Sequence, residues 1–231
     1  MSRLSRRNPW YDHGVKRVLD LVFALLSLII LLPVMSIILI ILVLSATPPI
    51  FRQKRVGLRC RTFYIYKFQT MTRERGADGE LLPDEERTTW IGRFLRSTSL
   101  DELPELINIL MGDMSLIGPR PWVPEQMAAF PERTQQERMS VRPGLSGLAQ
   151  ILGRNNLTFR QRVCLDIRYI RHQSLRLDLA IFFLTIYKVL KREGIYPSSD
   201  PPRRHRALGS TPKDPATKGQ RANRTREHYI A

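Results

Sequence analysis

The pattern of apolar and polar positions divides the chain into three parts. Residues 21–44 contain no ionisable side chain, and at about 1.5 Å per residue a helix of this length can cross a bilayer core. Residues 47–196 mix apolar and polar positions as a folded domain does. From residue 197 onward, proline, arginine and lysine replace the apolar residues that a core needs, which predicts a disordered basic tail. The predicted boundaries are therefore 1–46, 47–196 and 197–231.

The apolar segment has two interpretations: a single spanning helix or signal anchor, or a helix that enters and leaves the same face of the membrane. Pro33 lies near its middle, where the missing N–H and the ring predict a pronounced bend. Basic residues flank both ends, and the positive-inside tendency favours the cytoplasm for both flanks. A re-entrant helix bent at Pro33 satisfies both observations, and the hydroxyl of Ser27 or Ser36 or an adjacent helix can serve the backbone at the bend. The flanking residues are Arg3, Arg6, Arg7, Lys16 and Arg17 before the segment, and Arg52, Lys54, Arg55, Arg59 and Arg61 after it.

The part from 47 to 196 is predicted to be a compact, mostly helical α+β domain with a small β-hairpin. The hairpin is formed by Ile50–Arg55 and Thr62–Phe68 around Gly57, and Arg73–Arg87 is a surface loop or a frayed helix. Apolar spacing predicts helices at Leu100–Met111, Pro124–Met139 and Leu175–Leu190. The last is too short to span a bilayer, so it is either packed in the core or lies in the headgroup layer.

The composition shows a strong positive charge and gives no indication of a disulfide or a zinc site. The chain carries a formal net charge of +16 with 43% hydrophobic residues, so it needs an anionic partner. Nucleic acid, anionic lipid headgroups and phosphorylated substrates all qualify. Cys60 and Cys164 are far apart and form no paired motif, which indicates reduced thiols without a disulfide framework or zinc site.

The candidate chemistry centres on the adjacent carboxylates Asp101 and Glu102. An ordinary interpretation is available, because Ser99 and Glu102 can form a capping box and Asp101 complements the helix dipole. Downstream, however, prolines and glycines hold Arg120 and Arg154 on stiff loops suited to phosphate recognition. Together these residues indicate an anion site with a metal-binding centre, in which Mg²⁺ on the carboxylates neutralises a diphosphate. A phosphate acceptor is already ionised and needs no general base, which favours one carboxylate as a nucleophile.

Several motifs occur in the order typical of one family. They are Phe51–Gly57, Tyr66–Met71, Ser99–Pro104, Gly112–Ser115, Gly118–Pro121 and Arg142–Gly144 running on to Gly153–Asn155. Over about Lys16 to Gly194 the chain resembles the bacterial sugar transferases, the small monotopic polyprenol-phosphate phosphoglycosyl transferases. The resemblance implies a re-entrant membrane helix, a UDP-sugar donor, a polyprenol phosphate acceptor such as undecaprenyl phosphate, Mg²⁺, and a two-step reaction that releases UMP.

The resemblance also implies roles for individual residues. Asp101 would be the nucleophile that attacks the β-phosphorus, and Glu102 would support the metal. Cations around the phosphates would be Lys67, Arg96, Arg120 and Arg154, and Asp166 matches a further acidic position. Two departures concern Leu32, where the family often has serine before the bend proline, and Gln69, where it commonly has a cation.

Other interpretations remain open from the sequence. A single-span anchor with a basic domain for nucleic acid or anionic lipid explains the charge but not the arginine loops. A ternary-complex transferase would use no covalent step. The enzyme interpretation expects the phospholipid membrane as a partner and no nucleic acid, with the catalytic domain on the cytoplasmic face of the bacterial inner membrane. The sequence does not identify the sugar, the pathway or the role of the tail, and it does not decide between a monomer and a homodimer.

Overall fold

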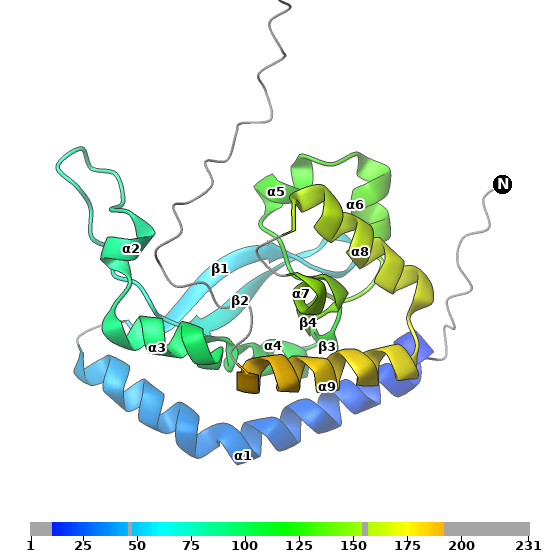
Figure 1. Ribbon diagram of the computed structural model, residues 1–231, viewed down its shortest axis with the longest axis horizontal. Helices are drawn as coiled ribbons and strands as arrows, with labels where there is room; N and C mark the ends of the chain where they lie inside the picture. The colour runs from blue at the N-terminus through cyan, green and yellow to red at the C-terminus, as the bar shows by residue number, and fades with distance from the viewer. Residues whose placement is uncertain (1–10, 46–47, 154–156, 192–231) are drawn as a thin grey trace, which may run out of the picture. The chain divides into compact units, whose positions relative to one another are not determined.

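The computed structural model describes residues 11–45, 48–153 and 157–191, with the backbone alone at residues 12 and 13. This part is mainly helical with a few short strands, which confirms the predicted mixture of helix and sheet (Figure 1). The predicted basic tail at 197–231 lies outside the described residues.

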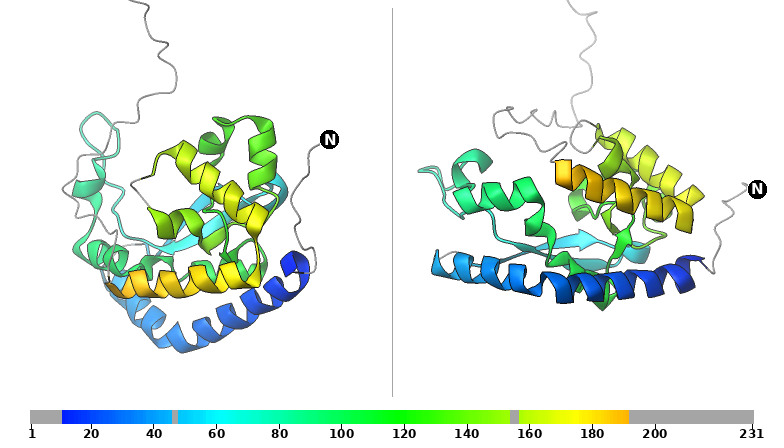
Figure 2. Two further views of the ribbon diagram at one scale, coloured as in Figure 1. Left: turned by 45° about the vertical axis from the view of Figure 1, so that its right-hand side comes forward. Right: turned by 60° about the horizontal axis from the view of Figure 1, so that its bottom comes forward.

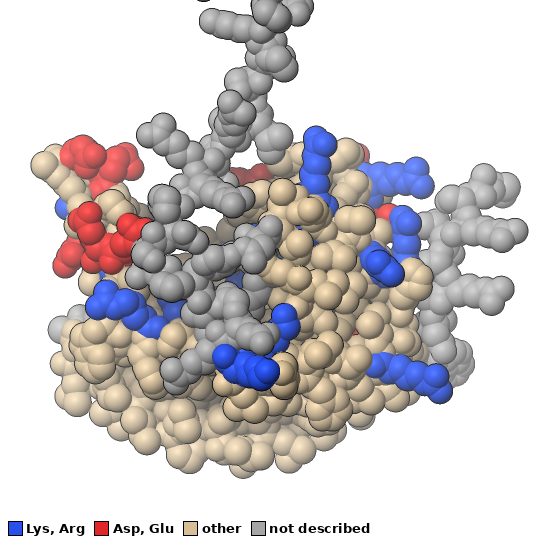
Figure 3. All heavy atoms as spheres, viewed as in Figure 1, with Lys and Arg blue, Asp and Glu red and all other residues tan. Residues whose placement is uncertain are grey.

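The apolar N-terminal run forms one long helix, α1 (Lys16–Leu44), after a π-helical turn, η1 (Tyr11–Val15). By length and composition α1 can cross a membrane, and 17% of its most apolar window is buried inside the protein. The other long helices lie on one side of it (Figure 2). In the view of Figure 3 the lower surface, formed largely by α1, shows no charged side chains, and the lysines and arginines stand above it. Many large apolar side chains of α1 are exposed, among them Ile29, Ile30 and Leu44. Most of α1 therefore presents an apolar face to the surroundings.

The internal proline bends α1 without interrupting it. The helix continues through Pro33 and is bent near its middle (Figure 1), as the missing N–H and the ring clash require. The Ser36 hydroxyl donates to the Leu32 carbonyl at 2.9 Å, one turn back. The carbonyl that loses its amide donor is that of Ile29, four residues before the proline. The Ser36 bond therefore supports the bend, as such bonds do, without replacing the lost one.

The predicted hairpin is confirmed. Strands β1 (Ile50–Val56) and β2 (Thr62–Phe68) pair antiparallel along their whole length and are joined through a short 3-10 turn, η2 (Leu58–Cys60). The stretch that follows was predicted as a loop or frayed helix. It contains an antiparallel bridge between Arg75 and Leu81 and the four-residue helix α2 (Asp84–Arg87).

The region around the acidic pair differs from the predicted helix over Leu100–Met111. It consists of a 3-10 turn, η3 (Leu100–Glu102), and a separate helix, α4 (Glu105–Met111), with Pro104 before the first helical residue. Proline is suited to a helix start but not to a helix interior, which explains the division.

The predicted capping box is wrong. Ser99 ends the preceding helix, α3 (Trp90–Thr98), in a left-handed conformation with φ 58°, and its side chain makes no capping hydrogen bond to η3. A left-handed residue is a common way to end a helix. The consequence is a sharp turn that carries Asp101 and Glu102 between two helices.

The predicted helix at Pro124–Met139 is also divided, into α5 (Pro124–Ala128) and α6 (Glu132–Arg138). Pro131 separates them, because its fixed φ and missing N–H start a new helix. The remaining elements are the parallel strands β3 (Ser115–Ile117) and β4 (Gly144–Ser146), and the helices α7 (Leu148–Leu152), α8 (Phe159–His172) and α9 (Leu175–Lys191).

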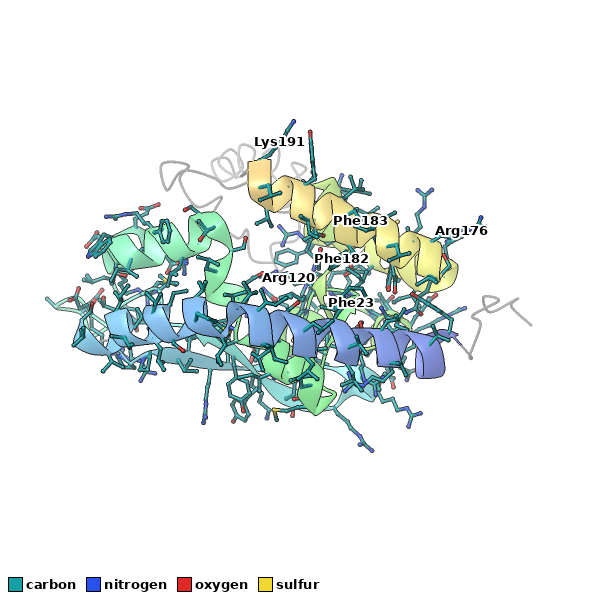
Figure 4. All side chains as sticks on the ribbon, turned by 90° about the horizontal axis from the view of Figure 1, so that it is seen from below. Phe23, Arg120, Arg176, Phe182, Phe183 and Lys191 are labelled. Atoms are coloured by element: carbon teal, nitrogen blue, oxygen red, sulfur yellow. The ribbon has the colours of Figure 1, made fainter. Side chains whose placement is uncertain are left out.

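Helix α9 runs alongside the first half of α1. Phe23 and Phe182 point toward each other between the two helices, with ring centroids 5.5 Å apart, and Arg176 and Lys191 lie near the two ends of α9 (Figure 4). Near the start of α1, the Lys16 ammonium lies 2.6 Å from the buried Asp178 carboxylate of α9. The second half of α1 packs its buried apolar residues against the end of β2 and against α3. The long helix is thus attached to the domain at both ends.

Candidate active site

The turn that carries the acidic pair is fixed to α1. Leu100 and Leu103, on either side of Asp101 and Glu102, are partly buried against a cluster that includes Ile38 and Leu42 of α1. Burial of such side chains stabilises their position by about 1.5 to 3 kcal/mol each when it is complete. The two carboxylates are therefore held beside the apolar helix.

Lys67 of β2 lies between two carboxylates. Its Nζ is 2.6 Å from Oε1 of Glu102 and 3.0 Å from Oε1 of Glu105, the first residue of α4. The side chain of Glu105 is only 3% exposed. Burial tends to lower the pKa of Lys67, but the charges of Glu102 and Glu105 outweigh it and raise the pKa. The lysine is therefore a permanent cation of the site.

Arg120 contacts the same carboxylate oxygen as Lys67. Its Nη2 donates to Oε1 of Glu102 at 3.0 Å, while 47% of its side chain stays exposed. Burial tends to raise the pKa of Glu102, but Lys67 and Arg120 lower that pKa far below the ordinary value. In contrast, burial and the charge of Glu102 raise the pKa of Glu105 to about 7. Glu102 thus stays ionised and orients both cations.

Asp101 differs from Glu102 in having a free carboxylate. Within the described ranges, no hydrogen bond or ion pair engages its side chain. Burial, followed by the neighbouring charge of Glu102, raises the pKa of Asp101 to about 6, although Lys67, Arg96 and Arg120 partly oppose the rise. A partly buried, unpaired carboxylate among cations is suited to react with an anionic ligand.

Arg96 reaches the site because α3 lies directly against the end of the hairpin. A Cβ at Gly92 would lie 2.0 Å from the Thr70 carbonyl, so only glycine permits this approach. Arg96 donates through Nε to the Thr70 hydroxyl at 3.0 Å and through Nη2 to the Met71 sulfur at 2.8 Å. The amide of the buried Gln69, where the family commonly has a cation, donates to the Met71 carbonyl. Gln69 thus supports the segment that holds Arg96.

One predicted site residue, Asp166, is linked to this group through a second side chain. Asp166 on α8 is 2% exposed and pairs with Arg138 of α6, whose Nε donates to Oδ2 at 2.8 Å. Arg138 in turn donates to the Arg120 carbonyl at 2.6 Å, which links Asp166 to the site through Arg138. Arg154 lies outside the described residues.

The structure brings three further residues to the site that no sequence motif had assigned to it: Glu105, Arg138 and Arg55. Arg55 of β1 donates to the Pro121 carbonyl at 3.1 Å, and burial lowers its pKa. A signal existed for Glu105, because it follows Glu102 by three residues and such neighbours share a helix face. The contacts that bring Arg55 and Arg138 to the site span more than ten residues of sequence and leave no local signal.

The residues suited to a metal are few. No group of three His, Cys, Asp or Glu side chains that could hold a metal occurs among the residues with described positions. Mg²⁺, however, commonly uses one or two carboxylates together with substrate phosphates and water. Asp101, whose carboxylate is free, and Glu102, which is engaged at Oε1, fit this mode of binding. Cys60 and Cys164 are exposed and form no disulfide bond in the structure.

The chain is similar in sequence to known proteins. Residues 11–192 match the family model described as bacterial sugar transferase. A Bacillus subtilis protein named uncharacterized sugar transferase EpsL is 48% identical over 149 residues, which cover 64% of this chain and 73% of that protein. The Caulobacter vibrioides UDP-glucose:undecaprenyl-phosphate glucose-1-phosphate transferase is 40% identical over 191 residues, which cover 78% and 72% of the two chains.

A longer relative is the Salmonella typhimurium undecaprenyl-phosphate galactose phosphotransferase. It is 36% identical over 199 residues, which cover 79% of this chain but 42% of that protein. The chain thus spans less than half of this relative and nearly three quarters of the other two. Because the family model covers most of the chain, including both Lys67 and the Asp101–Glu102 pair, this protein belongs to the bacterial sugar transferase family and is an enzyme of that class.

Proposed function

We propose that this enzyme transfers a phospho-sugar from a UDP-sugar to a polyprenol phosphate such as undecaprenyl phosphate, with release of UMP. The observation that carries the proposal is the free carboxylate of Asp101 among the cations of Lys67, Arg96 and Arg120. These cations can neutralise a diphosphate while the carboxylate approaches phosphorus. The names of the Caulobacter and Salmonella relatives, which specify undecaprenyl phosphate, support the acceptor.

The proposed reaction has two steps. A carboxylate oxygen of Asp101 forms a bond to the β-phosphorus of the UDP-sugar, and the bond from that phosphorus to the bridging oxygen breaks, so that UMP leaves with the oxygen. An oxygen of the polyprenol phosphate then bonds to the same phosphorus, and the aspartyl oxygen leaves as a carboxylate. No net proton transfer is needed, because attacking and leaving groups are anions in both steps. A direct transfer in a ternary complex is the alternative, and it predicts no exchange of labelled UMP into the donor without acceptor.

The same proposal includes Mg²⁺, held by Asp101 and Glu102. When bound, the ion would neutralise the charge of the diphosphate. Glu102 is suited to support it because its pKa is low and it stays ionised. We expect an excess of a divalent-metal chelator to stop UMP release and added Mg²⁺ to restore it. Full activity in the chelator would exclude the metal.

The pH dependence follows from the free carboxylate. Only ionised Asp101 can attack phosphorus, and its pKa is raised to about 6. The kcat/KM for the donor is therefore expected to be constant above that pH and to fall about tenfold per pH unit below it. Initial rates of UMP release at low donor concentration measure this profile. A rate that stays constant well below pH 5 would contradict an aspartate in this environment as the nucleophile.

The protein is further proposed to lie in the inner membrane with both ends of α1 on the cytoplasmic side. Three features of α1 support a re-entrant helix: its bend, its basic flanks and its attachment to the domain at both ends. Helix α9 was predicted to be either a core helix or a helix in the headgroup layer. The exposure of its side chains supports both, since one face is buried in the domain and another is exposed. Ile181 is buried in the domain, whereas Phe183 and Leu190 are 62% and 78% exposed. An exposed apolar face beside α1 is suited to the headgroup layer.

Labelling of single cysteines tests this topology. The native Cys60 follows α1, and it is labelled in a Cys164→Ser variant. Ser5→Cys places a thiol before α1, and it is labelled in a variant that also carries Cys60→Ser and Cys164→Ser. A re-entrant helix predicts that a membrane-impermeant maleimide reacts with both thiols only in inside-out vesicles. Reaction of the two thiols from opposite sides would establish a single span instead.

The reaction itself is tested with undecaprenyl phosphate and a panel of UDP-sugars, including UDP-glucose, UDP-galactose and acetamido sugars, with UMP release as the readout. We expect one donor to be preferred and release to depend on the acceptor for multiple turnover. Failure of every UDP-sugar would refute the proposed donor class. The non-enzymatic interpretation, a basic anchor for nucleic acid or lipid, is not compatible with the family assignment.

A further inference from the structure

The loop that presents Arg120 is unusual in how its backbone can be fixed. Pro119 and Pro121 flank the arginine, and neither has an N–H group. The loop therefore depends mainly on its carbonyl oxygens for hydrogen bonds. All four carbonyls from Pro119 to Trp122 accept one.

The two outer carbonyls are held by backbone amides. Gly144 of β4 donates to Pro119 at 2.9 Å, and Val56 of β1 donates to Trp122 at 2.9 Å. A Cβ at Gly144 would lie 2.1 Å from the Gly118 nitrogen, so the close approach of β4 requires glycine. These bonds fix the two ends of the loop.

The two central carbonyls are held by arginine side chains. Arg138 donates through Nη2 to the Arg120 carbonyl at 2.6 Å, and Arg55 donates through Nη1 to the Pro121 carbonyl at 3.1 Å. Arginine presents several donors in a rigid planar arrangement, so it can hold a carbonyl and a second acceptor at once. The peptide that carries the Arg120 side chain thus depends on Arg138.

Arg138 is itself rigidly held. It is fully buried, with an exposed fraction of 0%, and its guanidinium lies 4.2 Å from the ring centroid of Trp122. Asp166, which is 2% exposed, accepts from its Nε and lies 2.8 Å from its Nη2. A buried cation of this kind requires a counter-ion, and removal of either partner leaves an uncompensated charge.

We propose that Arg138, with Asp166 as its counter-ion, is a positioning residue for Arg120. It fixes the Arg120 carbonyl and so directs the Arg120 guanidinium toward Glu102 and the diphosphate. Because Arg138 is fully buried, it acts through Arg120 and does not touch the substrate. This inference rests on the proposed function, and it gives Asp166 an indirect role in place of a direct contact with the reacting groups.

A double-mutant experiment on the full-length enzyme in detergent or nanodiscs tests the proposal. Arg138→Lys keeps the charge but cannot hold both acceptors in the same geometry, so we expect the donor KM to rise about tenfold, as for a lost charge-assisted hydrogen bond, with a smaller change in kcat. In the Arg120→Ala background the same substitution should have almost no further effect on the KM. Asp166→Asn is the second variant and should raise the KM in the same way if Arg138→Lys does not fold.

Arg142→Lys is the matched control. Arg142 also holds a carbonyl, since its Nε donates to the Gly112 carbonyl at 2.9 Å, but Gly112 is the residue that ends α4 and is not part of the Arg120 loop. It should lower the unfolding temperature without raising the donor KM. Two results would overturn the inference: an equal rise of the donor KM for Arg142→Lys, or an undiminished effect of Arg138→Lys in the Arg120→Ala background. Either would show that Arg138 contributes only to the stability of the fold.

Binding of inorganic pyrophosphate to the same variants, measured by thermal shift, reports on the anion site independently of the reaction. We expect weaker binding for Arg138→Lys only when Arg120 is present. If the wild-type enzyme used no UDP-sugar but this coupling were found, the proposed function would fail and the positioning role would stand. If the wild-type enzyme turned over normally but Arg138→Lys weakened pyrophosphate binding equally with and without Arg120, the positioning role would fail and the proposed function would stand.

Discussion

Asp101→Asn is expected to lower kcat by about three orders of magnitude or more, as for other covalent nucleophiles. The amide cannot form the acyl phosphate, whereas Glu102, Lys67 and Arg120 keep their mutual contacts. Folding should be unaffected, because no described hydrogen bond uses the Asp101 carboxylate and its burial as an anion is unfavourable. UMP release under saturating donor and acceptor, together with a thermal unfolding curve, measures both effects.

Two further variants make this result specific. Asp84→Asn changes an exposed aspartate of α2 and should leave turnover unchanged. Asp101→Glu keeps the carboxylate but moves it by one methylene, and a displacement of this size is sufficient for a large loss of rate. If Asp101→Asn retained a near-normal rate, the assignment of the nucleophile would be wrong.

Lys67→Met is expected to destabilise the protein by about 3 kcal/mol and to remove activity. The substitution keeps the shape of the side chain but leaves Glu102 and Glu105 close together without the cation that lies 2.6 and 3.0 Å from them. Both carboxylates are largely buried, so water cannot compensate the lost charge. Denaturant unfolding in detergent gives the free energy of unfolding, and Lys67→Arg should show a much smaller loss.

The pH dependence identifies the cause of this loss. Without Lys67 the pKa of Glu105, which burial and Glu102 already raise to about 7, rises further, and the lowered pKa of Glu102 also rises. Near neutral pH the folded variant then binds more protons through Glu105 than the unfolded chain does. Its stability then falls as pH increases, and the deficit should be smaller at about pH 5 than at about pH 8. Adding Glu105→Gln should recover part of the stability at the higher pH. A deficit that is independent of pH and of Glu105 would indicate lost packing rather than uncompensated charge.

Local pattern was sufficient to predict much of the fold. The hairpin followed from β-branched and aromatic runs around Gly57, and the uncharged run before Ser45 predicted a long apolar helix with a bend at Pro33. In each case the determining interactions lie within one element or between neighbours in sequence.

The incorrect predictions arose where one residue serves two elements. Ser99 matched a capping box, but it ends α3, and the packing of α3 on the hairpin decided between the two roles. Pro131 was read as part of a helix, although a proline at that place favours a new start.

The candidate site was only partly predictable for a related reason. Asp101, Glu102, Lys67 and Arg120 were assigned from motifs, and the structure places them together. The contact of Arg138 with Asp166 joins residues 28 positions apart, and no periodic pattern marks it. This buried ion pair, which holds the Arg120 loop, forms only when helices α6 and α8 pack together, so the sequence alone does not indicate it.

The most direct test of the central proposal is the intact mass of the enzyme after incubation with its UDP-sugar alone. A covalent aspartyl intermediate predicts an added mass equal to one phospho-sugar, located on the peptide that contains Asp101, together with one equivalent of UMP. Addition of undecaprenyl phosphate should remove the added mass. An enzyme that keeps its unmodified mass with donor alone, under conditions in which the complete reaction proceeds, would contradict a covalent aspartyl intermediate.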